Sequence, residues 1–227
     1  MGSLAIGLRE NRAVRFWDSV NGKKAVMAVS GVFLFLFVLG HMAGNLQVFE
    51  GPEQFNHYGK LLRTLPEALW GIRAFLLVMV VLHITASVQL ALRKKRSRPI
   101  AYAKRKPIKS SYASRTMYWS GPIILAFLIY HLLDLTGGTV NPNFIEGDVY
   151  HNVIASFSRP LISIWYIFSM ILLALHLRHG VWSMMQTLGV SNPRWMLWFK
   201  RAATVFATVI FLGFVAVPIG VLTGVVK

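Results

Sequence analysis

The sequence contains no cysteine. It therefore cannot form disulfides, bind zinc or an iron–sulfur cluster through thiolates, or attach a haem covalently through a C-x-x-C-H motif. Acidic residues are also scarce. The chain has eight Asp and Glu and 24 Lys and Arg, which gives a formal net charge of +16. Charged residues make up only 14% of the chain, whereas a soluble domain carries about 25%. This composition argues against a soluble domain.

The chain instead contains long apolar runs, and hydrophobic residues make up 55% of it. Five runs are each long enough to cross a bilayer. We expect helices at roughly 24–48, 67–93, 115–137, 160–188 and 197–224, joined by polar loops at 50–66 and 137–159. The sequence predicts an all-α membrane protein, with residues 1–227 forming one domain, a bundle of five transmembrane helices. Residues 1–22 are expected to be an interfacial segment and not a cleavable signal peptide.

The positive charge is concentrated between the apolar runs. Residues 93–115 contain ten Lys and Arg and no acidic residue. Under the positive-inside rule this loop and the N-terminus are cytoplasmic, and five spans then put the C-terminus outside. The charge is thus explained by topology and lipid headgroups, and we expect no nucleic-acid partner.

Four of the five runs carry a histidine deep inside: His41, His83, His131 and His176. At a rise of about 1.5 Å per residue, His41 and His131 lie roughly 25 and 24 Å above the inner boundary, and His83 only about 15 Å. His176 is in the last third of its run, also on the inner side. One intramembrane histidine is equally well explained by a hydrogen bond to a neighbouring helix. Four residues at two matched depths favour two ligand pairs, His41 with His131 and His83 with His176.

The donor set limits the metal. Two imidazoles without a thiolate or carboxylate make a poor zinc site, because zinc prefers four protein ligands. They suit a haem iron, whose other four ligands come from the porphyrin, and without cysteine such a haem is b-type. The sequence therefore predicts a bundle that encloses two b haems, with the four histidines as axial ligands of the iron. The candidate neighbours of these haems are Gly44, Arg63, Arg73 and His179.

The order of motifs around the histidines resembles a known family. The motifs are G-H-M-x-G-N-L (Gly40 to Leu46), L-H ending at His83, Y-H-L around His131, and H-L-x-x-G-x-W-S from His176. Over about residues 20–225 this order is similar to the di-haem cytochrome b membrane anchor subunit of succinate:quinone oxidoreductase, the succinate dehydrogenase and fumarate reductase family. The resemblance implies that His41 and His131 hold the outer haem, and His83 and His176 the inner one.

The same resemblance implies partners and a location. A flavoprotein subunit with FAD and an iron–sulfur subunit dock on the cytoplasmic face of a bacterial inner membrane. Electrons then pass through the haems to a membrane quinone, which we expect to be menaquinone. Related menaquinol-oxidising fumarate reductases carry a glutamate where this chain has Ala174, so we favour succinate oxidation.

A quinone site needs a proton donor or acceptor close to a haem and to the membrane surface. The outer candidates are Glu50, Glu53, His57 and Glu67, and the inner candidates are Lys23, Lys24 and Ser30. Two other interpretations remain open. One is a haem b subunit of another respiratory complex, such as a formate dehydrogenase, nitrate reductase or hydrogenase. The other is a colourless proton-coupled transporter that uses the histidines as a relay.

Overall fold

The computed structural model describes residues 12–97, 112–190 and 192–227, and these form helices and no strand. Five helices are long and apolar enough to cross a membrane. They are α2 (Val20–Leu46), α4 (Pro66–Arg96), α5 (Tyr112–Leu135), α7 (Pro160–Thr187) and α8 (Met196–Leu222). The expected all-α class with five spanning helices is thus confirmed, and the architecture is that of a multi-pass membrane protein. Most of the basic loop at 93–115 lies outside the described residues.

Four short helices flank the long ones: α1 (Arg12–Asp18), η1 (Gln47–Glu50), α3 (Pro52–Leu61) and α6 (Val149–Phe157). The segments expected as polar loops at 50–66 and 137–159 therefore contain helices, and that part of the expectation is wrong. Local signals account for both. Pro52 occupies the first turn of α3, where it leaves no hydrogen bond unmade. The side chain of Asp148 caps α6 by accepting from the backbone N–H of His151.

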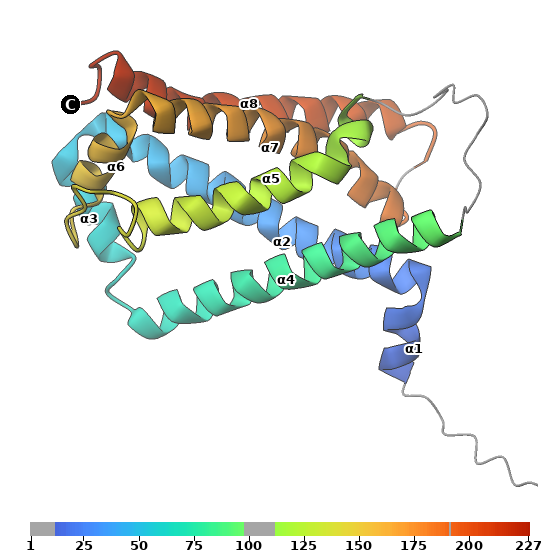
Figure 1. Cartoon of the computed structure of the whole chain (residues 1–227). Coiled ribbons are helices and arrows are strands. Elements are labelled where there is room, and N and C mark those ends of the chain that lie inside the picture. Colours follow the sequence, from blue (N-terminus) through green and yellow to red (C-terminus); the bar gives the residue numbers. More distant parts are fainter. Residues whose placement is uncertain (1–11, 98–111, 191) are drawn as a thin grey trace, which may run out of the picture.

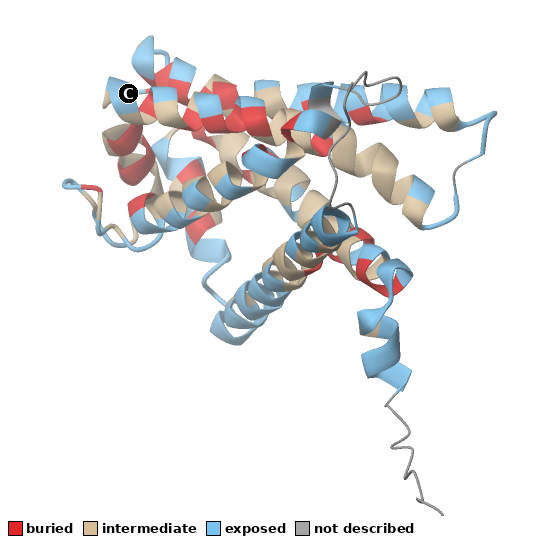
Figure 2. Cartoon of the chain, turned by 45° about the vertical axis from the view of Figure 1, so that its right-hand side comes forward, coloured by how far each residue is buried: buried red, intermediate tan, exposed pale blue. Residues whose placement is uncertain are grey.

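Helix α2 contacts α4, α7 and α8, while α7 packs most extensively against α8 and also against α5 (Figure 1). Helix α4 rests mainly on α2, and its one buried residue is Ala86. Figure 2 shows most of its surface exposed. In a bilayer such a surface meets lipid or another subunit. Helices α3, α6 and the C-terminus gather at one end of the bundle, and α1 lies at the other.

The best-packed part of the molecule is the end with α3 and α6. Its buried apolar cluster consists of Val48, Phe55, Val153, Phe157, Tyr166, Val217, Val221 and Val226. The hydroxyl of Tyr150 in α6 donates to the carbonyl of Lys227, which ties down the last residue. A second cluster around Met42 and Ile210 joins α2, α7 and α8. Glycine allows the close approach there, because a side chain at Gly213 would collide with Met42.

Candidate functional site

The four deep histidines meet in two pairs, each made by two different helices. The ring centres of His41 in α2 and His131 in α5 are 5.8 Å apart, with the ring planes at 80°. Those of His83 in α4 and His176 in α7 are 6.3 Å apart, with the planes at 55°. These are the pairs that the depth argument joined, and among the described residues no ring contact connects one pair to the other.

Both separations suit two imidazoles that share one metal. With each nitrogen about 2 Å from the metal, the two ring centres lie about 6 Å apart. Among the described residues no group of three or more His, Cys, Asp and Glu could hold a metal ion. Each pair therefore offers two ligands, and a metal bound there needs its other ligands from elsewhere. A macrocycle that supplies four, as in haem, completes the set. Haem ligation by these residues stays a prediction.

His83 is held by the backbone of α2. Its Nδ1 lies 3.0 Å from the carbonyl oxygen of Met27 and 3.3 Å from the hydroxyl of Ser30. A carbonyl only accepts, so Nδ1 carries the proton and Nε2 keeps a free lone pair. A Cβ at Gly31 would be 3.4 Å from Cε1 of the His83 ring, in van der Waals contact. A ring fixed through Nδ1, with Nε2 free, has the arrangement that metal-binding histidines use.

His176 has a polar atom that the protein leaves unsatisfied. Its Nδ1 is buried without a hydrogen-bond partner among the described residues, and so is Nδ1 of His179, one turn on. Buried polar atoms without partners are rare in folded proteins, and a bound group that supplies the partner is one explanation. His179 contacts the edge of Trp182, with ring centres 5.7 Å apart. A Cβ at Gly180, the residue after His179, would meet nothing within 4 Å, so open space lies beside His179.

His131 is linked to a buried carboxylate through Tyr166. The Tyr166 hydroxyl lies 3.4 Å from Nδ1 of His131 and donates to Asp134 at 2.9 Å. Because its proton goes to Asp134, its oxygen can accept from Nδ1–H of His131. On the other side of the pair, His41 stacks on Phe37 with ring centres 5.3 Å apart. The amide nitrogen of Asn45 lies 3.3 Å from both ring nitrogens of His41.

Asp134 itself is fully buried and neutralised. Arg159 forms an ion pair with it at 2.9 Å, and Ser156 donates a hydrogen bond to its second oxygen. Reasoning from sequence missed Arg159, Ser156 and Tyr166 as partners of this carboxylate. A signal for one of them was present, because a buried carboxylate needs a cation and Arg159 is the only Lys or Arg in the segment 137–159.

The outer quinone-site candidates lie in η1, in α3 and in the first turn of α4. Glu53 and His57 line the same shallow surface pocket, together with Pro52, Asn56 and Lys60. Glu50 ends η1, and Glu67 is in the first turn of α4. All four are exposed.

The three inner candidates also have separate settings. Lys23 is buried beside Asp18, and Lys24 is exposed. The hydroxyl of Ser30 donates to the carbonyl of Val26 and lies near His83.

The remaining candidate neighbours have contacts of their own. A Cβ at Gly44 would be 2.6 Å from the hydroxyl oxygen of Tyr58, so this glycine makes room for Tyr58 of α3. The guanidinium of Arg73 lies over the ring of Trp70, 5.0 Å from its centre. Arg63 is exposed. None of these contacts involves a histidine of the two pairs, and a role as haem neighbours stays a prediction for all three.

Comparison with protein-family models, curated proteins and solved structures finds no match to this chain. The function is therefore argued from the site and from the order of motifs in the sequence.

Proposed function

We propose that this chain is the membrane anchor and electron-transfer subunit of a succinate:quinone oxidoreductase and holds two b-type haems. The observation that carries the proposal is the presence of two histidine pairs, with ring centres 5.8 and 6.3 Å apart, on four apolar helices. The motif order around these residues, similar to that family, supplies the identity of the complex. Two haems at two depths make a path for electrons across the bilayer.

His41 and His131 would hold the outer haem, and His83 and His176 the inner one. When bound, haem supplies one-electron redox chemistry. The chain's own contribution is to fix the ligands and keep water out. Met27 orients the ring of His83 through its carbonyl, and Tyr166 does the same for His131 through its hydroxyl. Preset rings need no rearrangement when an electron arrives or leaves.

The rest of the proposal concerns orientation and partners. The end with α1 and the basic C-terminus of α4 would face the cytoplasm of a bacterial cell, as the positive-inside rule requires. A flavoprotein with FAD and an iron–sulfur subunit would dock there. The pocket of Glu53 and His57 lies at the opposite end, where a carboxylate and an imidazole could exchange protons with a quinone, expected to be menaquinone.

Purification of the tagged chain from its own membranes tests this proposal. We expect co-purification of a flavoprotein and an iron–sulfur protein, and reduction of b-type haem when succinate is added. A molybdenum or nickel subunit in place of the flavoprotein would assign the chain to another respiratory complex. A colourless preparation that contains the folded chain would contradict haem binding and favour the proton-coupled transporter.

A further inference from the structure

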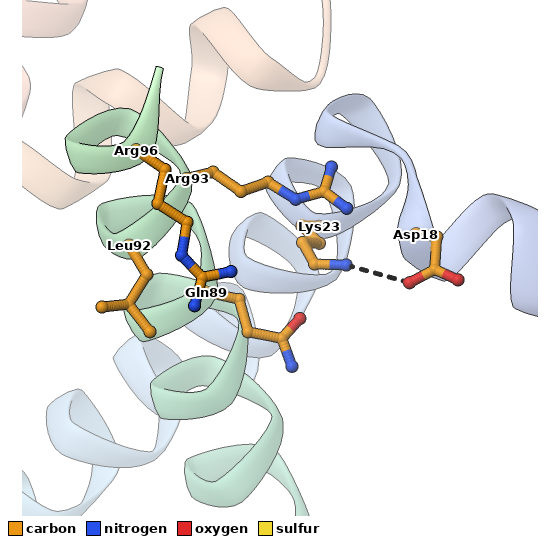
Figure 3. Close-up of a pocket in the computed structure, with 6 residues that line it drawn as sticks. All are labelled: Asp18, Lys23, Gln89, Leu92, Arg93 and Arg96. Atoms are coloured by element: carbon orange, nitrogen blue, oxygen red, sulfur yellow. Dashed lines mark ion pairs between the residues drawn. The ribbon is translucent and has the colours of Figure 1, made fainter. Parts of the chain in front are cut away.

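A basic pocket lies between α1, α2 and α4, at the end of the bundle opposite to α3 and α6 (Figure 3). Its volume is about 290 Å³. The lining residues are Asp18, Lys23, Gln89, Leu92, Arg93 and Arg96. None of them belongs to the histidine pairs or to the pocket of Glu53 and His57, and only Lys23 is also one of the inner quinone-site candidates. The site therefore does not depend on the proposed haem binding.

The charge of this pocket is not balanced by the described part of the chain. Lys23 is 2% exposed, and its ammonium is held by the Trp17 carbonyl and by Asp18, 3.7 Å away. No carboxylate of the described residues lies within ion-pair distance of Arg93 or Arg96. Three cations against one carboxylate leave a net charge of +2 in a small volume. Such a site favours an anion with several oxygens, because guanidinium groups bind phosphate in a bidentate manner.

The position of the pocket indicates where this phosphate comes from. The pocket opens where α4 ends in Arg93, Lys94, Lys95 and Arg96 and where the membrane-spanning part of α2 begins. Leu92 adds an apolar wall, and its side chain is 47% exposed. Figure 3 shows Arg93 extending from α4 toward α1 and α2, and Arg96 running along α4 beside Leu92 and Gln89. A pocket that is cationic at a helix end and apolar toward the bilayer matches a lipid headgroup with its first chain carbons.

We propose that this pocket binds the phosphate of an anionic phospholipid, with Arg93 and Arg96 as the direct ligands and Lys23 as a preset third cation. Asp18 holds Lys23 in place and limits the total charge. Gln89 is placed to donate to a headgroup oxygen. The bound lipid would add a link from α4 to α1, beside the extensive contact that α4 already makes with α2.

The test uses the purified full-length chain in mixed micelles, titrated with phosphatidylglycerol, phosphatidylcholine or inorganic phosphate. Binding is followed as a rise in the thermal unfolding temperature and as lipid retained per chain by mass spectrometry. We expect phosphatidylglycerol to bind best, and the double variant Arg93→Gln/Arg96→Gln to bind it about tenfold more weakly or worse. Arg201→Gln is the matched control. It also removes a cation near the start of α8, where Arg201 lies over Trp198, outside the pocket. This control should change binding less than about twofold.

Unchanged phosphatidylglycerol binding in a double variant of normal helicity would overturn the proposal. Equal stabilisation by inorganic phosphate would overturn the assignment to lipid. Loss of a bound pigment without loss of lipid would assign the arginines to a cofactor and also overturn it. If the double variant does not fold, Arg96→Gln alone gives the decision, because this side chain is exposed and its loss should still weaken binding about threefold.

Discussion

The carboxylate of Asp134 lies 2.9 Å from the guanidinium of Arg159 and is fully buried near the end of α5. This ion pair joins α5 to the start of α7. Through Tyr166 the same carboxylate is connected to His131. One buried charge therefore supports both the packing of two helices and the position of a proposed haem ligand.

Replacement of Arg159 should destabilise the bundle, because it leaves the buried Asp134 without its cation. We expect Arg159→Met to cost about 2 kcal/mol or more. This destabilisation is smaller than for a fully buried ion pair, because the Arg159 side chain is 32% exposed. Thermal unfolding in detergent measures it, with the exposed Arg63→Met as control. The double variant Asp134→Asn/Arg159→Met should recover part of the loss. Equal stability of Arg159→Met and Arg63→Met would show that the pair contributes nothing.

Tyr166→Phe should change the outer haem and leave the inner one unaltered. The variant keeps the aromatic contacts with Phe127 and Phe157 but removes the hydroxyl between His131 and Asp134. Without this link to a carboxylate, His131 becomes a less basic ligand and stabilises oxidised iron less. Redox titration should show a higher midpoint potential for one of two haems. A shift of both haems by the same amount, or of neither, would contradict the assigned link.

Gly31→Val should disturb the inner pair. A Cβ at this position would already touch the His83 ring, so the added methyl groups would push the ring away from the Met27 carbonyl. We expect the haem content to fall from two to one per chain. Gly71→Val is the control, because a Cβ at Gly71 meets nothing within 4 Å. Wild-type haem content in Gly31→Val would mean that haem binding does not need the His83 ring to stay against the Met27 carbonyl.

The α6 cap should respond to acid. The backbone N–H of His151, and to a smaller extent the Asn56 amide, lower the pKa of Asp148 below its ordinary value of 3.8. The cap therefore stabilises α6 fully above pH 4, and this stabilisation is lost as the pH falls through the lowered pKa. Pepsin cleavage within residues 144–157 should rise below pH 4. Asp148→Ala should be cleaved readily at pH 4 as well, since it lacks about 1 kcal/mol of capping. The control variant Glu146→Gln should be cleaved like the wild type. An equal rise in pepsin cleavage in Asp148→Ala and Glu146→Gln would argue against the cap.

Hydropathy predicted the five long helices because spanning segments must be apolar over their whole length. Depth along each helix then predicted that His41 would meet His131 and that His83 would meet His176. Periodicity could not predict which side chains of α3 and α7 contact α2 and α5. Tyr166 reaches His131 only because α7 packs against α5, and Tyr58 reaches Gly44 only because the segment after η1 folds into a helix. Such contacts depend on tertiary packing, which no local pattern in a single sequence predicts.

The most direct test of the central claim is the haem content of the purified chain and of its four single His→Ala variants, determined from reduced-minus-oxidised spectra. The account predicts two b haems per wild-type chain. His41→Ala and His131→Ala should lose the same haem, and His83→Ala and His176→Ala should lose the other. Two haems retained in any of these variants, or one haem lost jointly by His41→Ala and His83→Ala, would contradict the pairing on which the proposed function depends.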